Sequence, residues 1–236
     1  MAAMTWLDAV NRVRREAGVS GSNLASIGGT ISAENTRIKD WVNEAWIDIQ
    51  RLRPDWKFML SDFAFNTVAA TSDYTAATLS TPLTRFKSWK RDTFRAYLTA
   101  TGFSDEQIVP FLDFSSFRDM YLFGNMRSTT GRPVLFSVDQ DKHLRIGPIP
   151  DDVYTVNGQY YRLATGFTAE TDTPQTTAPL FEEDFHMLIV WKALESYGFY
   201  ESASEVLLRA QTEAQKIMSR LTIDEMPEIS YGPPLA

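Results

Sequence analysis

The long runs of helical periodicity lie at the two ends of this 236-residue chain, and this constrains the fold more than any other feature of the sequence. Near the N-terminus, apolar residues recur at helical steps over 33–53, and Pro54 follows directly. Because proline cannot continue a helix, the pattern predicts a long helix that ends there. A shorter helix is predicted over 5–17, with Thr5 as its N-cap and Gly18 just beyond its end.

Two further helices are predicted near the C-terminus, over 180–199 and 202–223. The carboxylates 182–184 fall in the first turn of the former, where the helix dipole favours negative charge. Between the helical ends, alternating apolar and polar residues and turn-forming residues replace the helical pattern. Strands are predicted there over 61–68, 85–98, 134–138, 143–147 and 153–164, with small helices over 104–112 and 113–123.

The last of these strands contains Asn157-Gly158, a pair that is favoured in two-residue hairpin turns. In the alternative, the strand is continuous and Gly158 marks a bulge or a close approach of another chain segment. We favour the continuous strand, because Pro148 and Pro150 already provide a turn before it.

The order of helices, strands and helices predicts an α+β fold, in which a helical bundle from both ends of the chain carries an inserted antiparallel β module. The length corresponds to between one and two domains of roughly 150 residues. We expect residues 1–57 and 179–225 to form the discontinuous bundle, 58–178 the β module and 226–236 an extended C-terminal tail.

That tail is rich in proline and cannot form a helix. It is too short to bury its own apolar residues, so either it is disordered or it docks in an extended form onto another chain. The residues that would make such a contact are Ile229, Tyr231, Pro233, Pro234 and Leu235.

Composition excludes several classes of function. The chain has no cysteine, which rules out disulfides, thiolate zinc sites, iron–sulfur sites and a thiol nucleophile. A formal net charge of −7 argues against free nucleic-acid binding, which depends on basic surfaces. No membrane span or export signal is predicted.

No enzyme motif is found: glycine-rich phosphate loops, the nucleophile elbow and the paired-histidine zinc motif are all missing from the sequence. His143 and His186 are the only histidines, and neither has a second ligand at metal-binding spacing, so structural roles are expected for both. We therefore predict that the protein is not an enzyme and has no cofactor, no metal and no catalytic residues.

Two acidic pairs are candidates for sites. Asp139 and Asp141 resemble the start of a calcium loop, but Leu144 stands where that loop needs glycine, so a polar turn is expected. Asp151 and Asp152 follow a proline turn and are also expected to be turn residues. The alternative, from another class of function, is a hydrolase or glycan-binding module that uses these four carboxylates.

The densest basic and aromatic stretch, residues 85–95, has two interpretations. Its arginines and lysines alternate with Phe86, Trp89 and Phe94, a mixture that single-stranded nucleic acid binds. In the other interpretation it is a strand whose aromatic face is buried and whose basic face is solvated. The acidic net charge favours the buried strand.

Several local patterns resemble the head-to-tail adaptor (connector, head-completion) proteins of tailed bacteriophages, including the tail tubular A type. The resemblance spans most of residues 37–223 and is architectural, with no catalytic signature. The segments that carry it are Arg37–Trp46 with Trp56, Arg132-Pro133, His143–Pro150, Tyr160–Arg162, and Pro179-Leu180 with Phe185-His186 and Ala193.

The resemblance implies a structural virion protein of the neck, with a β-sandwich-like insertion in its helical bundle, assembled in the host cytoplasm. About twelve copies would form a ring that binds the portal protein and a downstream tail or neck protein. Genomic DNA would pass through this ring without sequence-specific binding, and no membrane would be involved. It also implies that residues 227–236 reach into the portal. The alternatives in the same field are a stopper or a tail-tube subunit.

Overall fold

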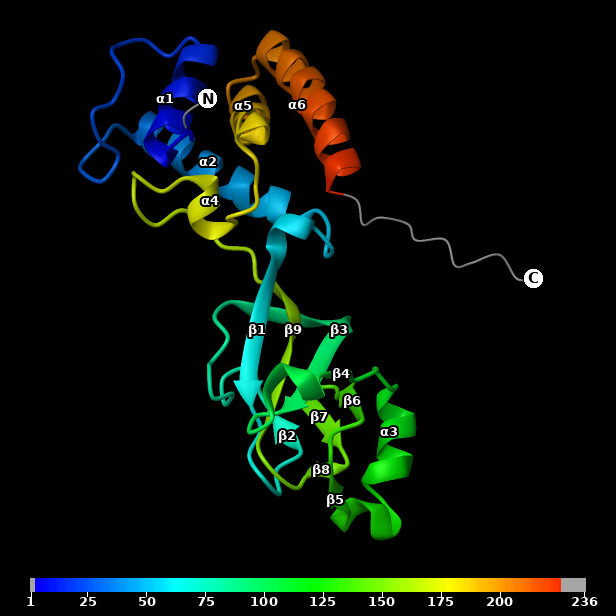
Figure 1. Ribbon diagram of the computed structural model, residues 1–236. Coiled ribbons are helices and arrows are strands. Elements are labelled where there is room, and N and C mark those ends of the chain that lie inside the picture. The colour runs from blue at the N-terminus through cyan, green and yellow to red at the C-terminus, as the bar shows by residue number, and fades with distance from the viewer. Residues whose placement is uncertain (1–2, 226–236) are drawn as a thin grey trace. The chain divides into compact units, whose positions relative to one another are not determined.

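The order of secondary structure along the chain is that of a mixed protein. The computed structural model describes residues 3–225, which run from helices into a block of strands and back into helices (Figure 1). The α+β class is thereby confirmed.

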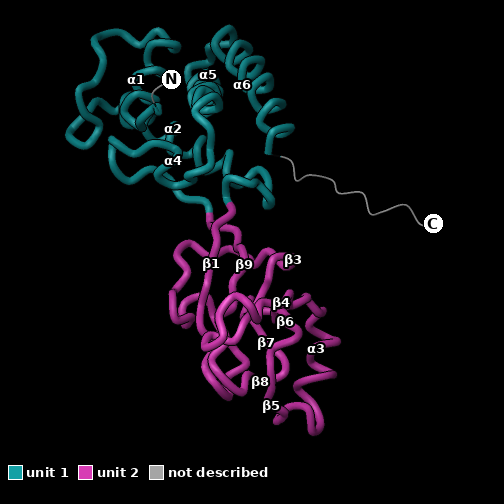
Figure 2. Tube along the Cα trace, viewed as in Figure 1, with its two compact units in different colours: residues 1–59, 164–236 teal, residues 60–163 magenta. Residues whose placement is uncertain are grey.

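The chain divides into two units, drawn in different colours in Figure 2: residues 1–59 with 164–236, and residues 60–163. The first, unit 1, is helical. Its elements are α1 (Trp6–Glu16), α2 (Ala33–Arg51), η1 (Lys57–Met59), α4 (Pro174–Thr177), η4 (Glu183–Phe185), α5 (Met187–Tyr200) and α6 (Ser204–Asp224).

Helices α1, α2 and α6 match the predicted ones to within two residues. Helix α5 begins at Met187, seven residues after the predicted start, so carboxylates 182–184 lie at the separate turn η4 and not, as was expected, in the first turn of α5. Thr5 caps α1 through a capping box with Asp8, and the Ser32 side chain caps α2. Helix α5 packs against α1, α2 and α6, and its residues 188–191 are all buried. Four consecutive buried residues leave no side of this turn facing water, as is typical of a helix inside a protein, and α5 is the helix that α1, α2 and α6 all contact.

An aromatic cluster fills the interior of unit 1. The Trp46 ring stacks with those of Phe58 and Phe167 and lies 4.9 Å from that of Phe181. Its buried indole Nε1 donates a hydrogen bond of 2.9 Å to Thr177 Oγ1. Segments from both ends of the chain therefore meet at one side chain of α2.

Unit 2 is mainly β structure. Its elements are β1 (Leu60–Asn66), β2 (Asp73–Tyr74), β3 (Phe86–Leu98), η2 (Gly102–Asp105), β4 (Gln107–Ile108), α3 (Phe114–Tyr121), η3 (Gly124–Ser128), β5 (Thr130–Gly131), β6 (Leu135–Val138), β7 (Leu144–Gly147), β8 (Ile149–Pro150) and β9 (Tyr154–Arg162). An antiparallel sheet has the order β1-β9-β3-β4, and a second has the order β2-β7-β6. Strands β5 and β8 form a separate parallel pair.

Both antiparallel sheets contribute to one hydrophobic core. Trp89 and Phe94 of β3 and Val156 of β9 belong to it, as do Phe136 of β6 and Ile146 of β7. The rings of Phe94 and Phe136 stack at 3.9 Å between centroids. The two sheets are therefore stabilised by burying side chains against each other.

Strand β9 is continuous through Asn157-Gly158, which confirms that no turn forms there. Gly158 pairs with Phe63 of β1, and a Cβ atom at Gly158 would lie 3.1 Å from that phenyl ring. The glycine therefore permits a close approach across the sheet.

The predicted helix over 104–112 is wrong. The structure has the short η2 and then β4, which pairs with β3 through Ile108 and Gln107. The Asp105 carboxylate, which resembles a helix cap in the sequence, accepts hydrogen bonds from Leu98 N–H and from Arg132. Contacts distant in sequence decide the structure of this segment.

The boundary after β9 also differs from the expected one at residue 178. Residues 164–178 belong to unit 1, where Phe167 N–H donates to Asn43 Oδ1 at 2.7 Å and Thr177 binds Trp46. Helix α4 lies within this segment. Among the described helices, none is both long and apolar enough to span a bilayer.

Candidate functional site

The predicted contact residues Ile229, Tyr231, Pro233, Pro234 and Leu235 lie outside the described residues. The structure does describe the point from which this C-terminal tail departs. Helix α6 ends at Asp224, and the following Glu225 is buried.

Two hydrogen bonds fix this point of departure. The Glu225 carboxylate accepts from Phe58 N–H at 3.0 Å, and Lys57 Nζ donates to the Asp224 carbonyl at 3.1 Å. Burial raises the pKa of Glu225, and the Phe58 hydrogen bond opposes that rise. The end of α6 is thus held against η1.

A groove runs beside the end of α6. Leu52, just after α2, and Ile223 of α6 line it with Ala214 and Met218, and the groove has a volume of about 850 Å³. A smaller hollow of about 440 Å³ along α2 shares Leu52 and Met218 with it. Leu52 and Ile223 are 59% and 75% exposed, so the described residues leave apolar side chains open near the end of α6.

The sequence gives little sign of this groove or of the Glu225 anchor. Glu225 reads as an ordinary polar residue after a helix, and Leu52 as one more apolar residue of the α2 pattern. Only the position of η1 and the packing of α5 against both α2 and α6 bring them to one surface.

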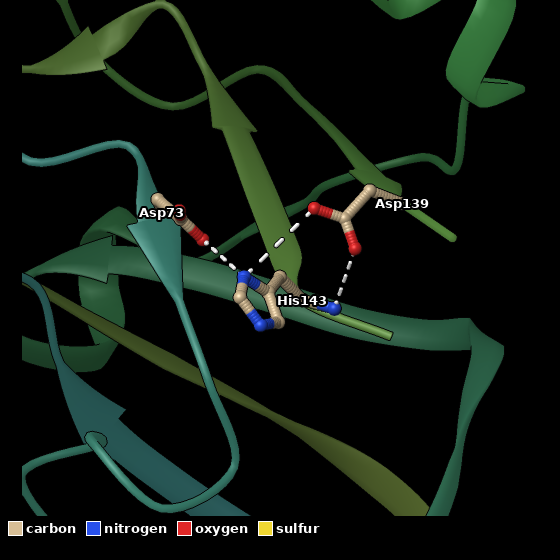
Figure 3. A group of neighbouring side chains, drawn as sticks. All are labelled: Asp73, Asp139 and His143. Atoms are coloured by element: carbon tan, nitrogen blue, oxygen red, sulfur yellow. Dashed lines mark hydrogen bonds and ion pairs between the residues drawn. The ribbon is translucent and has the colours of Figure 1, made fainter. Parts of the chain in front are cut away.

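The side chains of Asp73, Asp139 and His143 converge in unit 2, as Figure 3 shows. His143 Nδ1 lies 3.2 Å from Asp73 Oδ1 and 3.9 Å from Asp139 Oδ2. Arg145, however, binds both carboxylates, at 2.9 Å to Asp73 and 3.1 Å to Asp139. Its guanidinium supplies the positive charge that a bound cation would supply, so the group is an ion-pair network that joins β2 to β7.

Three of the four carboxylates of the hydrolase alternative, those of Asp139, Asp151 and Asp152, make local contacts. Asp139 Oδ1 accepts from the N–H groups of Asp141 and His143, which confirms the polar turn. Asp152 accepts from Val153 N–H, and Asp151 accepts from the Tyr154 hydroxyl at 2.8 Å. Burial and this last hydrogen bond raise the pKa of Tyr154 to about 12.

The histidine in unit 1 is part of the packing. His186 is buried directly before α5, and its ring stacks on that of Phe181. Nδ1 accepts from Met4 N–H at 3.1 Å, and Nε2 faces the Gln175 amide at 2.9 Å. Burial lowers the pKa of His186 to about 4, so the imidazole is neutral at pH 7.

The basic and aromatic stretch forms β3. Trp89 and Phe94 are buried in the core of unit 2, and the Phe86 ring packs on that of Trp89. Because the Trp89 and Phe94 rings are buried, they are not available to stack on bases, and the interpretation as a buried strand is confirmed for these two residues.

Arg132, from the Arg-Pro pair singled out in the sequence, holds two segments of unit 2 together. Its Nη1 donates to both Asp105 carboxylate oxygens at 2.7 Å, and its Nη2 donates to the carbonyls of Asp105 and Ala96. Such bidentate pairs fix geometry as well as adding energy. Beyond this clamp, unit 2 exposes several large apolar side chains between η2 and η3, namely Phe103, Ile108, Met120, Phe123 and Met126.

The described chain therefore offers no assembled catalytic group among the predicted residues, and its uncovered apolar surfaces are suited to binding proteins. No curated protein is similar enough to this sequence to count as a match. A model of the SU10 adaptor protein family matches residues 4–234, which is nearly the whole chain and includes both units. The chain belongs to the SU10 adaptor protein family, whose members are structural adaptors of bacteriophage virions.

Proposed function

We propose that this adaptor forms the ring that joins the phage head to the tail: it binds the portal protein, extends the DNA channel and presents a surface to the next tail or neck component. The observation that carries the proposal is the match to the adaptor family over residues 4–234. About twelve copies, related by head-to-tail contacts that close on themselves, would make the ring. The tail tubular A type is the subgroup that the local sequence patterns favour.

Two sets of apolar residues, one in the tail and one in unit 2, support two protein contacts. The tail begins at the anchored end of α6 and carries the apolar residues Ile229, Tyr231 and Leu235, which suit a groove on the portal. The exposed side chains between Phe103 and Met126 in unit 2 suit the downstream component. Assembly would take place in the host cytoplasm, before the neck is complete.

The charge of the protein suits a DNA channel. A ring of about twelve copies would carry roughly −84 formal charges. Acidic walls repel phosphate, so genomic DNA would slide past without binding to them.

Co-sedimentation with purified portal protein tests the proposal. We expect the full-length chain to pellet with portal, and we expect deletion of residues 227–236 to abolish this binding, because the deletion removes the proposed contact. Ile229→Ser with Tyr231→Ser should weaken binding strongly, whereas the control Ser230→Ala keeps every apolar residue of the tail and should bind as the wild type does.

A different result would assign another place in the virion. If the full-length chain bound tail particles and ignored portal, it would be a stopper or a tail-tube subunit and the proposal would be wrong.

A further inference from the structure

One side of helix α6 has no partner among the described residues. Its buried residues Ala210, Ala214, Ile217 and Leu221 face inward, and its extensive packing is against α5. The side that faces the end of α2 borders the groove of about 850 Å³ lined by Leu52, Met218 and Ile223. Such exposed apolar residues, gathered on one surface, are typical of a site that another segment covers.

We propose that this groove is the docking site of the chain's own residues 226–236 before the protein meets a partner. The tail would lie extended along α6, with Ile229 and Tyr231 against the apolar lining. This claim concerns the free protein, and it goes beyond portal binding.

The length of the tail and its starting point fit this site. Glu225 is anchored to Phe58 two residues after Ile223, so the tail starts at one end of the groove. From Thr222 back to Gln211, α6 rises by roughly 17 Å, which about five extended residues cover. Residues 226–236 can therefore turn back after Pro227 and still pass the whole groove.

The chemistry of the two surfaces is also complementary. Prolines 227, 233 and 234 prevent a helix and leave backbone carbonyls without partners inside the segment. Gln211, Gln215 and Ser219 line the groove, and the side-chain amides of the two glutamines offer hydrogen-bond donors to such carbonyls. The apolar tail residues find Leu52, Met218 and Ile223 between these donors.

A tethered segment has an advantage over any other occupant. Because the tail is covalently attached beside the groove, its effective concentration there is of the order of millimolar, far above that of a second copy in dilute solution. This step rests on the function proposed above, in which the same tail residues bind portal. Only molecules whose tail is free of the groove can then bind, so the apparent affinity for portal is the intrinsic affinity multiplied by the fraction of such molecules. The ring would then assemble only where portal outcompetes the groove.

The absence of cysteine from the chain allows a clean cross-linking test. In the free, full-length protein, Gln215→Cys in the groove is combined with Ser230→Cys in the tail, which spares the apolar tail residues. The control pair combines Ser230→Cys with Arg220→Cys, which lies nearer the tail along the chain but on a different face of α6. We expect the intramolecular disulfide to form about tenfold faster in the Gln215 pair, because docking holds the tail on that face.

A second pair of variants keeps the test specific. Leu52→Ser, in the groove, should slow the Gln215 cross-link towards the rate of the control pair. Leu180→Ser should not, although that leucine is similarly exposed, at 61% against 59% for Leu52. Both positions are on the surface, so the circular dichroism and melting temperature of each variant should stay close to those of the parent.

Two results would overturn the proposed docking site. One is an equal rate of cross-linking for the Gln215→Cys and Arg220→Cys pairs. The other is that, at high dilution, the disulfide of the Gln215→Cys pair joins two copies of the chain instead of two residues of one copy. Neither result depends on portal. Loss of portal binding with normal cross-linking would instead contradict only the function proposed above.

Discussion

At the scale of single residues, two buried titratable groups of unit 1 respond to pH in opposite senses. Burial lowers the pKa of His186 to about 4, below its ordinary value of 6.5. Burial raises the pKa of Glu225 above its ordinary value of 4.5. As pH rises from 4.5 towards the folded-state pKa of Glu225, this carboxyl group lowers the free energy of unfolding. As pH rises from 4 to 6.5, His186 raises it.

The histidine contribution can be isolated by substitution. Between pH 6.5 and 4 the imidazole of residue 186 is protonated in the unfolded chain and neutral in the folded chain. This difference lowers the free energy of unfolding by about 3 kcal/mol by pH 4. We expect His186→Gln, whose amide still accepts from Met4 N–H, to lose less stability between pH 7 and 4.5 than the wild type does. Urea unfolding at the two pH values measures this difference. An equal loss in both proteins would mean that the folded state takes up the proton at His186.

At the scale of elements, the close crossing of α5 and α6 depends on one glycine. A Cβ atom at Gly198 would lie 2.9 Å from Leu207 Cβ and 3.0 Å from Leu207 Cα, so the backbone of α6 would have to move. We expect Gly198→Ala to lower the free energy of unfolding by about 1–3 kcal/mol, because the crossing becomes overpacked.

Gly29→Ala is the matched control for this change, because nothing lies within 4 Å of the Cβ position there. Chemical denaturation of both variants measures the effect. If Gly198→Ala were as stable as Gly29→Ala, the two helices would not cross as closely as described.

The elements also show how far a sequence determines this fold. The helical spacing of Ile38, Val42 and Ile49 predicted α2, and all three are buried. The segment 104–112 was mispredicted, because β4 exists only through its pairing with β3 and Asp105 is engaged by Arg132, which is distant in sequence. Local pattern determines long amphipathic helices, whereas two-residue strands depend on contacts that the local pattern does not contain.

The candidate site was less predictable than the fold. The tail was singled out by its prolines and apolar residues, and it stays a prediction because it lies outside the described residues. The groove and the Glu225 anchor need α2, α5, α6 and η1 in one place, so they required the structure.

At the scale of the whole molecule, the protein is a phage structural adaptor with two units of different kinds. Membership of the family implies contacts with other head and tail components. The helical unit carries the groove and the start of the tail, and the β unit exposes apolar residues between η2 and η3. Among the described residues, each unit thus exposes apolar side chains of its own, which suits contacts with other components of the virion.

Electron microscopy of the full-length protein mixed with purified portal tests the central claim most directly. The account predicts a single closed ring of adaptor subunits stacked on the portal, coaxial with its channel, and no such ring when residues 227–236 are deleted. Portal particles that stay bare in the presence of excess full-length protein would contradict it.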